Sequence, residues 1–240
     1  MTSYLKGDVM DWKPPQRPAA LTETRLIEAI LTGVYPIHAT LPAERDLAEQ
    51  LGVTRPTLRE ALQRMARDGW IDIQHGKSTR VQNYWEEGSL GVLNALADHS
   101  QHLPPNFIPK LLQIRLLLAP AYTYEAILHQ PGEVQTLTAS LIHTSDEAIA
   151  FTEADWKLHH TLTLLSGNPV FSLILNGFAD LYGQLGVHYF TPEANRHHSR
   201  HFYRKLHQHS LEQDANAARK LTETIMQASI RRWTQLHTGD

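Results

Sequence analysis

The sequence contains no cysteine in its 240 residues, which excludes disulfide bonds, thiolate metal sites and cysteine nucleophiles. No apolar run reaches the ~18 residues that a membrane-spanning helix requires. The segment Met1–Lys13 also lacks the apolar core of a secretory signal. These absences predict a cytoplasmic protein that has no membrane partner.

The motifs of the common enzyme classes are missing as well. The sequence has no His-Glu-x-x-His zinc motif, no glycine-rich phosphate loop and no nucleophile elbow. We therefore expect a protein that is not an enzyme, with no catalytic residues and no cofactor.

Neither sign of charge dominates the chain, whose formal net charge is -3. This balance argues against nonspecific coating of nucleic acid. Residues 53–82, however, hold six Lys or Arg against three Asp or Glu. A local basic surface on a mildly acidic chain is typical of a small DNA-binding module that is attached to another domain.

Residues 41–62 have the pattern of two short helices joined by a tight turn. Gly52 supplies the residue that such a turn requires, and Thr54 is suited to cap the second helix. Arg55 and Arg59 are one turn apart on one face of that helix, and apolar residues occupy its opposite face. This arrangement is typical of a recognition helix that enters the major groove of DNA.

The following segment predicts a β-hairpin. Trp70–Gln74 alternates apolar and polar residues as a strand does, and Thr79–Asn83 is predicted as the second strand. The turn between them has His75, Gly76 and Lys77 at its tip. A hairpin after a helix-turn-helix makes a winged helix, and its donors can enter a minor groove or bind a phosphate.

Downstream of Asn83 the sequence predicts only helices. We expect them over residues 108–128, 133–143, 146–165, 169–187, 192–211 and 214–236. The predicted fold class is mainly α, with an N-terminal winged helix-turn-helix and a C-terminal all-helical ligand-binding bundle. The expected domains are an N-terminal arm (1–20), a winged-helix DNA-binding domain (21–83), a linker helix (84–97) and a helical ligand-binding domain (98–240).

Together these segments resemble a known family of regulators. Leu41–Arg45 followed by Val53–Leu62 resembles the winged-helix signature of the GntR superfamily. Arg67–Lys77 narrows the resemblance to the FadR-type, acyl-CoA-responsive regulators of fatty-acid metabolism. Further similar segments are Ser166–Pro169, Leu173–Gly177 and His188–Phe190.

The resemblance implies a homodimer that binds palindromic double-stranded operator DNA and leaves it when long-chain acyl-CoA binds. It also implies repression of fatty-acid degradation genes and activation of some synthesis genes. The implied DNA contacts are Arg45, Thr54, Arg55, Thr57, Arg59, His75, Gly76 and Lys77. The implied ligand contacts are Arg115, Tyr182, Tyr189, Tyr203, Ser229 and Trp233.

Two positions depart from the resembled pattern. Pro56 stands where a second threonine is usual, and Met226 stands where a glycine is expected. A bulky Met226 is expected to narrow the ligand pocket. Arg115 falls on an otherwise apolar helix, so it needs either a ligand or a buried carboxylate as its partner.

A metal site is the main alternative reading of the ligand domain. Many related domains bind a divalent cation through a histidine that corresponds to His159, but the other ligand positions correspond here to Tyr203 and Ile225. We therefore expect no metal, and a His159 that is buried or lines the pocket. The alternative function keeps DNA binding but takes a small carboxylate as effector, with or without a metal. A metal-dependent helical hydrolase is a third and less supported class.

Overall fold

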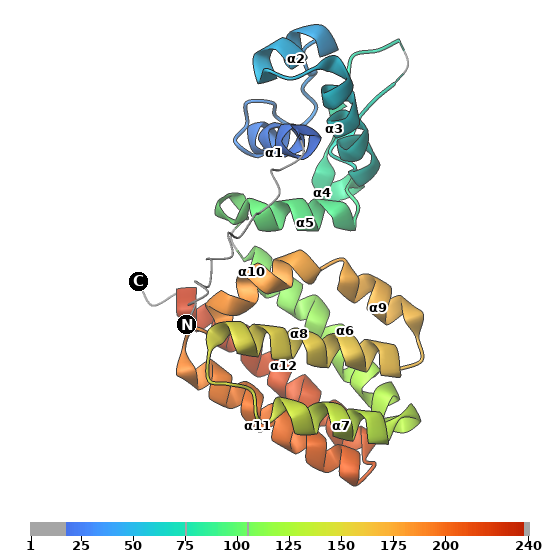
Figure 1. Ribbon diagram of the computed structural model, residues 1–240, viewed down its shortest axis with the longest axis vertical. Coiled ribbons are helices and arrows are strands. Elements are labelled where there is room, and N and C mark those ends of the chain that lie inside the picture. The colour runs from blue at the N-terminus through green and yellow to red at the C-terminus, as the bar shows by residue number, and fades with distance from the viewer. Residues whose placement is uncertain (1–17, 75, 105, 238–240) are drawn as a thin grey trace, which may run out of the picture. The chain divides into compact units, whose positions relative to one another are not determined.

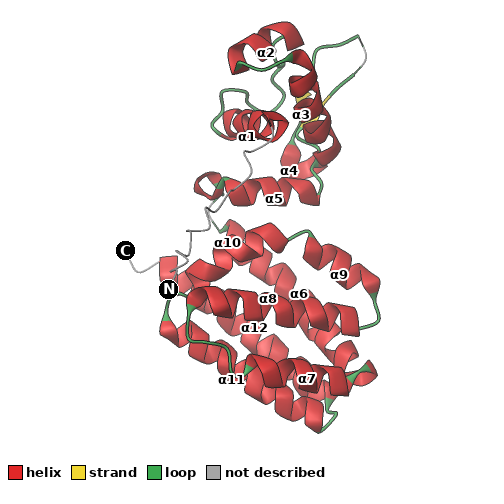
Figure 2. Cartoon of the chain, in the orientation of Figure 1, coloured by secondary structure: helices red, strands yellow, loops and turns green. Residues whose placement is uncertain are grey.

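The structure is a computed structural model that describes residues 18–74, 76–104 and 106–237 (Figure 1). The chain divides into two compact units, with the boundary between Ser89 and Leu90. In the described residues, helices form almost all of the regular structure, and the paired strands form one small hairpin (Figure 2). The prediction of a mainly α fold with an N-terminal winged helix is confirmed.

The first unit begins with a helix that starts inside the expected N-terminal arm. Its elements are α1 (Pro18–Leu31), α2 (Glu44–Leu51), α3 (Arg55–Asp68), β1 (Ile71–Asp72), β2 (Arg80–Val81) and α4 (Tyr84–Glu87). Pro18 is tolerated at the first position of α1 because the N–H that proline lacks has no partner there. The expected arm (1–20) therefore overlaps the start of α1. Residues 1–17 lie outside the described part of the chain.

The helix-turn-helix forms as predicted. Gly52 has a φ of 67° at the end of α2, in the left-handed region that favours glycine. Thr54 caps α3: its Oγ1 accepts a hydrogen bond from the Thr57 N–H at 3.4 Å and lies 2.9 Å from the Thr57 hydroxyl. The buried face of α3 carries Leu58, Ala61, Leu62 and Met65.

The first helix of this motif begins later than residue 41, where the predicted two-helix pattern starts. The helix begins at Glu44 because the preceding residues pair with the hairpin instead. The N–H of Leu41 donates to the Thr79 carbonyl at 2.9 Å, and Thr40 forms a β-bridge with Arg80. A residue held in this extended pairing is not available to start a helix.

The wing hairpin is present, but its strands are shorter than predicted. Ile71 pairs with Val81 and Asp72 with Arg80 in antiparallel register. One backbone bond, from the Gln82 N–H to the Trp70 carbonyl at 2.9 Å, extends the pairing towards the body of the unit. The described loop residues beyond Asp72 belong to the exposed turn.

The described residues of the second unit form helices and one short 3₁₀ turn. Its elements are α5 (Leu90–Asp98), η1 (Ser100–His102), α6 (Phe107–His129), α7 (Pro131–Leu141), α8 (Ala148–Leu165), α9 (Pro169–Asn176), α10 (Ala179–Phe190), α11 (Glu193–Leu211) and α12 (Ala215–His237). The predicted linker helix over 84–97 therefore forms as two helices, α4 in the first unit and α5 in the second.

One predicted helix, over residues 169–187, is broken into α9 and α10. The two helices meet at a bend of 69°. At the break, the Gly177 N–H donates to the Ile174 carbonyl, and a Cβ at Gly177 would lie 2.9 Å from Cδ1 of Leu90. The apolar periodicity continues through the break, so the sequence pattern alone does not show that α5 packs there.

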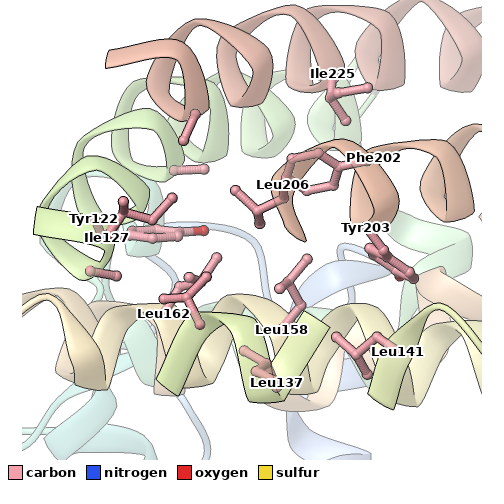
Figure 3. Close-up of a cluster of buried hydrophobic side chains, with 14 of the residues drawn as sticks. Tyr122, Ile127, Leu137, Leu141, Leu158, Leu162, Phe202, Tyr203, Leu206 and Ile225 are labelled. Carbon is pink, nitrogen blue, oxygen red and sulfur yellow. The ribbon is translucent and has the colours of Figure 1, made fainter. Parts of the chain in front are cut away.

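A buried apolar core lies between α6, α7, α8, α11 and α12 (Figure 3). Side chains from all five helices point into it, among them Tyr122, Leu137, Leu158, Phe202 and Ile225. Four of these helices, α6, α8, α11 and α12, also carry polar residues of the site described below.

In the described part of the chain, no single helix is long and apolar enough to cross a membrane. The bent pair α9 and α10 passes that test by length and composition together. Both helices instead line the pocket described below.

Candidate functional site

The N-terminal end of α3 presents the predicted DNA-reading arginines. Arg55 and Arg59 each expose 57 % of the side chain, consistent with their predicted place on the outer face. Both lie against Glu44, the first residue of α2. Its Oε2 accepts a hydrogen bond from Arg59 Nε at 2.7 Å and lies 3.8 Å from Arg55 Nη2. The sequence reasoning did not identify Glu44, which is 15 residues away from Arg59.

The other predicted contacts in the first unit surround this pair. Arg45 is highly exposed, and its Nε donates to Asp46 at 3.0 Å. Thr54 and Thr57 place their hydroxyls at the start of α3, 2.9 Å from each other. Pro56 sits in the first turn of α3, so its missing N–H removes no helical bond.

The tip of the wing is described in part. Gly76 has a φ of 74°, with no neighbour near the position of a Cβ. Lys77 donates from Nζ to Gln74 Oε1 at 2.8 Å. His75 lies outside the described residues.

The second unit contains a large pocket between α6, α8, α9, α10 and α12. Its empty space is about 900 Å³, including the part that is open to solvent, and most of its wall is apolar. Five of the six predicted ligand contacts line it: Arg115, Tyr182, Tyr189, Ser229 and Trp233. Tyr203 is fully buried and lies behind the wall.

Asp155 is the centre of the polar groups in the pocket. Arg115 Nη2 donates to its Oδ2 at 2.7 Å, which identifies the buried carboxylate as the partner that Arg115 requires. The Tyr182 hydroxyl donates to the same oxygen, and the Tyr203 hydroxyl donates to Oδ1 at 3.2 Å. Tyr203 therefore contacts the pocket through Asp155. Asp155 appears in no predicted set of contacts.

The charges of this pair support each other. Burial raises the pKa of Asp155, but the neighbouring groups, of which the Arg115 guanidinium contributes most, together outweigh it, so the net pKa lies below the usual value. Burial lowers the pKa of Arg115, but its neighbours, chiefly Tyr182 and Asp155, outweigh this effect, so the net pKa lies above the usual value. Burial raises the pKa of Tyr182 and Tyr203, so both hydroxyls stay protonated and donate.

His159 is buried beside this network. The sequence predicted that it is either buried or lines the pocket. Its Nδ1 lies 2.7 Å from the Tyr122 hydroxyl. Burial and the Arg115 charge lower the pKa of His159 to about 3, so its ring is neutral and its 3.9 Å contact with Asp155 is not an ion pair. Within the described residues, no group of three or more His, Asp or Glu side chains is arranged to hold a metal ion.

A second polar group lies on the wall that α12 contributes. The Tyr189 hydroxyl donates to Ser229 Oγ at 3.2 Å, and the Tyr189 ring stacks with Trp233 at a centroid distance of 6.5 Å. Met226, on the same helix, lies in the buried core and is absent from the pocket wall. The expectation that Met226 narrows the pocket directly is therefore not supported by its position.

Known families match both units. Residues 82–239 match the FadR C-terminal domain, and residues 19–81 match the bacterial regulatory proteins of the gntR family. The chain belongs to the GntR family, with a FadR C-terminal domain. This GntR-family protein is thus a DNA-binding transcription regulator.

Its relatives include proteins named fatty acid metabolism regulator protein. That of Shewanella oneidensis is 42% identical over 189 residues, which cover 79% of this chain and 79% of the relative. That of Shewanella frigidimarina is 42% identical over 199 residues, which cover 83% of this chain and 82% of the relative. Because these relatives are regulators, the prediction that the GntR-family protein is not an enzyme is confirmed.

Solved structures share the fold at low identity. The Listeria monocytogenes protein Lar has a TM-score of 0.53 and 17% identity, covering 91% of this chain and 97% of that one. The E. coli protein McbR/YncC has a TM-score of 0.50 and 18% identity, covering 92% of this chain and 99% of that one. These likenesses support the architecture of the GntR-family regulator and nothing finer.

Proposed function

We propose that this GntR-family regulator controls genes of fatty-acid metabolism as a cytoplasmic homodimer and leaves operator DNA when long-chain acyl-CoA binds. It represses degradation genes and activates some synthesis genes. The names of its relatives support the metabolic role. The observation that carries the choice of effector is the large, mostly apolar pocket of the second unit.

The chemistry of the pocket suits an acyl chain. Burying each methylene contributes at most about 0.8 kcal/mol, so a long chain gains steadily from a dry wall. Polar groups for the coenzyme end are the Tyr189–Ser229 pair and the Trp233 ring.

The same pocket gives little support to the small-carboxylate alternative. Arg115 is the cation in its wall, and Asp155 already neutralises it at 2.7 Å. A carboxylate effector would have to displace that pair or add a second buried negative charge, and both cost free energy. A neutral, apolar chain avoids this conflict.

In the first unit, we propose that the predicted positions contact a palindromic operator. The two-fold axis of a homodimer would match that of the DNA, and each α3 would enter a major groove. Phosphate contacts would position the unit, and the arginines and the wing would read base edges. The proposed contacts are Arg45, Thr54, Arg55, Thr57, Arg59, His75, Gly76 and Lys77.

We also propose that α10 and α5 carry the signal away from the pocket. Tyr182 and Tyr189 of α10 line the pocket, while Gln184 Nε2 on the same helix donates to Asp98 of α5 at 3.0 Å. Gly177, next to α10, lies against Leu90 of α5. Since α5 begins where the first unit ends, a shift of α10 reaches the chain that enters the DNA-binding unit. Coupling is reciprocal, so operator DNA weakens acyl-CoA binding by the same factor.

A gel shift tests the proposed function. The probe is an operator of the type that fatty-acid regulators bind, and palmitoyl-CoA, free CoA, palmitate and small carboxylates with or without Zn²⁺ are added in turn. We expect palmitoyl-CoA to release the DNA and the other additions to act weakly. Release by a small carboxylate, or by a carboxylate only with metal, would favour the alternative. Size-exclusion chromatography with light scattering checks the homodimer.

A further inference from the structure

One carboxylate joins the two helices of the helix-turn-helix at the proposed DNA surface. The helices α2 and α3 are labelled in Figure 1. Glu44 is the first residue of α2, and Arg55 and Arg59 lie in the first two turns of α3. A single oxygen, Oε2 of Glu44, is 2.7 Å from Arg59 Nε and 3.8 Å from Arg55 Nη2. An acidic residue in this place works against the attraction of DNA phosphates, so its position needs an explanation.

Stability is a weak explanation. Both arginines expose 57 % of their side chains and Glu44 exposes 35 %. Ion pairs with this degree of exposure are screened by water and contribute little to folding. The first turn of α2 also contains Asp46, so the favourable interaction of an acidic residue with the helix N-terminus does not depend on Glu44.

The geometry of the Arg59 contact suggests a different role. A guanidinium has five N–H donors, of which one is on Nε. Glu44 occupies that donor, and no described residue accepts a hydrogen bond from the two terminal nitrogens of Arg59. The terminal nitrogens form the end of the fork that reads O6 and N7 of a guanine. Glu44 thus binds Arg59 through Nε and leaves its two terminal nitrogens without an acceptor among the described residues.

We propose that Glu44 is a positioning residue that gives the recognition helix its sequence selectivity. It orients Arg59 and restrains Arg55, and its charge reduces the nonselective attraction of both side chains to phosphates. This inference rests on the proposed contact of Arg55 and Arg59 with operator DNA. It adds a residue that does not itself need to touch the DNA.

The experiment compares selective and nonselective DNA binding by the full-length chain. The probes are a duplex enriched from a random-sequence library by the wild-type protein and a shuffled duplex of the same composition. Glu44→Gln removes the charge, and Glu44→Asp keeps the charge but shortens the reach. The matched control is Glu60→Gln, because Glu60 pairs with Arg64 at 2.5 Å on α3, and the variant makes the same change of charge.

We expect Glu44→Gln to bind the shuffled duplex more tightly than wild type does. Its preference for the enriched duplex over the shuffled duplex should fall about tenfold, as for one lost base contact. The slope of log affinity against log salt concentration should steepen by about one released counterion. Glu44→Asp should fall between wild type and Glu44→Gln, and Glu60→Gln should keep the wild-type ratio. All variants should melt at the wild-type temperature.

Two results would overturn the role of Glu44: a wild-type ratio and salt slope in Glu44→Gln, or an equal loss in Glu60→Gln. Arg55→Ala and Arg59→Ala, measured beside them, separate this failure from a failure of the proposed function. If those two variants lose selectivity while Glu44→Gln does not, only the role of Glu44 is wrong. If both arginine variants also keep wild-type selectivity, the assigned DNA surface itself is wrong.

Discussion

Arg115 and Asp155 form an ion pair of 2.7 Å in the wall of a mostly apolar pocket. Each partner removes the cost of burying the other, and Tyr182 and Tyr203 satisfy the remaining carboxylate positions. Arg115 and Asp155 are therefore charged but neutralise each other in the pocket wall. The same pair contributes to the stability of the helical unit and shapes the surface that a ligand meets.

Removing either partner of this pair alone should be costly. Arg115→Met leaves the Asp155 carboxylate buried and unpaired, and we expect a loss of about 3 kcal/mol in the free energy of unfolding. Adding Asp155→Asn removes the stranded charge, so the double variant should lose less than the sum of the two single variants. Urea unfolding of the four proteins measures the coupling. Strictly additive effects would show that the two side chains do not depend on each other.

His159 should make the protein sensitive to acid. Its pKa is about 3 in the folded chain and near 6.5 when unfolded, so the unfolded state binds more protons between these values. Stability therefore falls as the pH drops from 6.5 towards 3, by about 2 kcal/mol at pH 5 from this residue. We expect His159→Gln to show a smaller loss between pH 7 and pH 5 in urea unfolding.

His197→Gln is the control for that measurement, because His197 is an exposed histidine on α11. It should follow the wild-type pH profile. A His159→Gln profile parallel to wild type would mean that the acid sensitivity comes from other groups.

The sequence predicted the elements better than it predicted their partners. Apolar periodicity, the left-handed Gly52 and the Thr54 cap are local signals, and they located the helix-turn-helix and most helices of the second unit. The break at Gly177 depends on the packing of Leu90 from another helix. No local pattern contains that information.

The site shows the same limit. The sequence indicated that Arg115 needs a partner, but the partner is 40 residues away and only the packing of α6 against α8 identifies it. Glu44 was likewise part of the quoted winged-helix segment, yet its contact with two arginines requires the angle between α2 and α3. Pairings between distant residues are what a single sequence leaves undetermined.

The arginines of α3 should be needed for operator binding and dispensable for folding. Arg55→Ala and Arg59→Ala should each weaken operator binding by about 1–3 kcal/mol, because each would remove a proposed base contact. Arg67→Ala is the control, since Arg67 is an exposed arginine in the last turn of the same helix. Fluorescence anisotropy with an operator duplex measures the affinities. Equal losses in all three variants would indicate a general effect of charge.

The protein should not depend on a metal. Tyr203 and Ile225 occupy two of the positions that correspond to metal ligands in the resembled metal-binding domains. The Tyr203 hydroxyl instead donates a hydrogen bond to Asp155. We expect elemental analysis of the purified protein to find no stoichiometric Zn, Ni or Mn, and EDTA to leave its melting temperature unchanged. One tightly bound metal per chain would contradict this and would favour the small-carboxylate alternative.

Ser229→Asn should separate DNA binding from the response to ligand. Ser229 is almost fully buried in the pocket wall, where its Oγ accepts from Tyr189 at 3.2 Å and donates to the Ile225 carbonyl at 3.0 Å. A larger side chain there must enter the space next to Trp233, which crowds the proposed coenzyme end of the ligand. We therefore expect normal operator binding and little or no release by palmitoyl-CoA.

Thr224→Asn provides the matched control, because Thr224 is an exposed residue on the same helix. Gel shifts with increasing palmitoyl-CoA measure release, and tryptophan fluorescence reports whether the ligand still enters the pocket beside Trp233. We expect the control to respond as wild type does. A Ser229→Asn protein with normal release would place the effector elsewhere in the helical unit. Loss of operator binding together with loss of the ligand response would instead mean that the substitution disturbs the fold, and circular dichroism distinguishes that case.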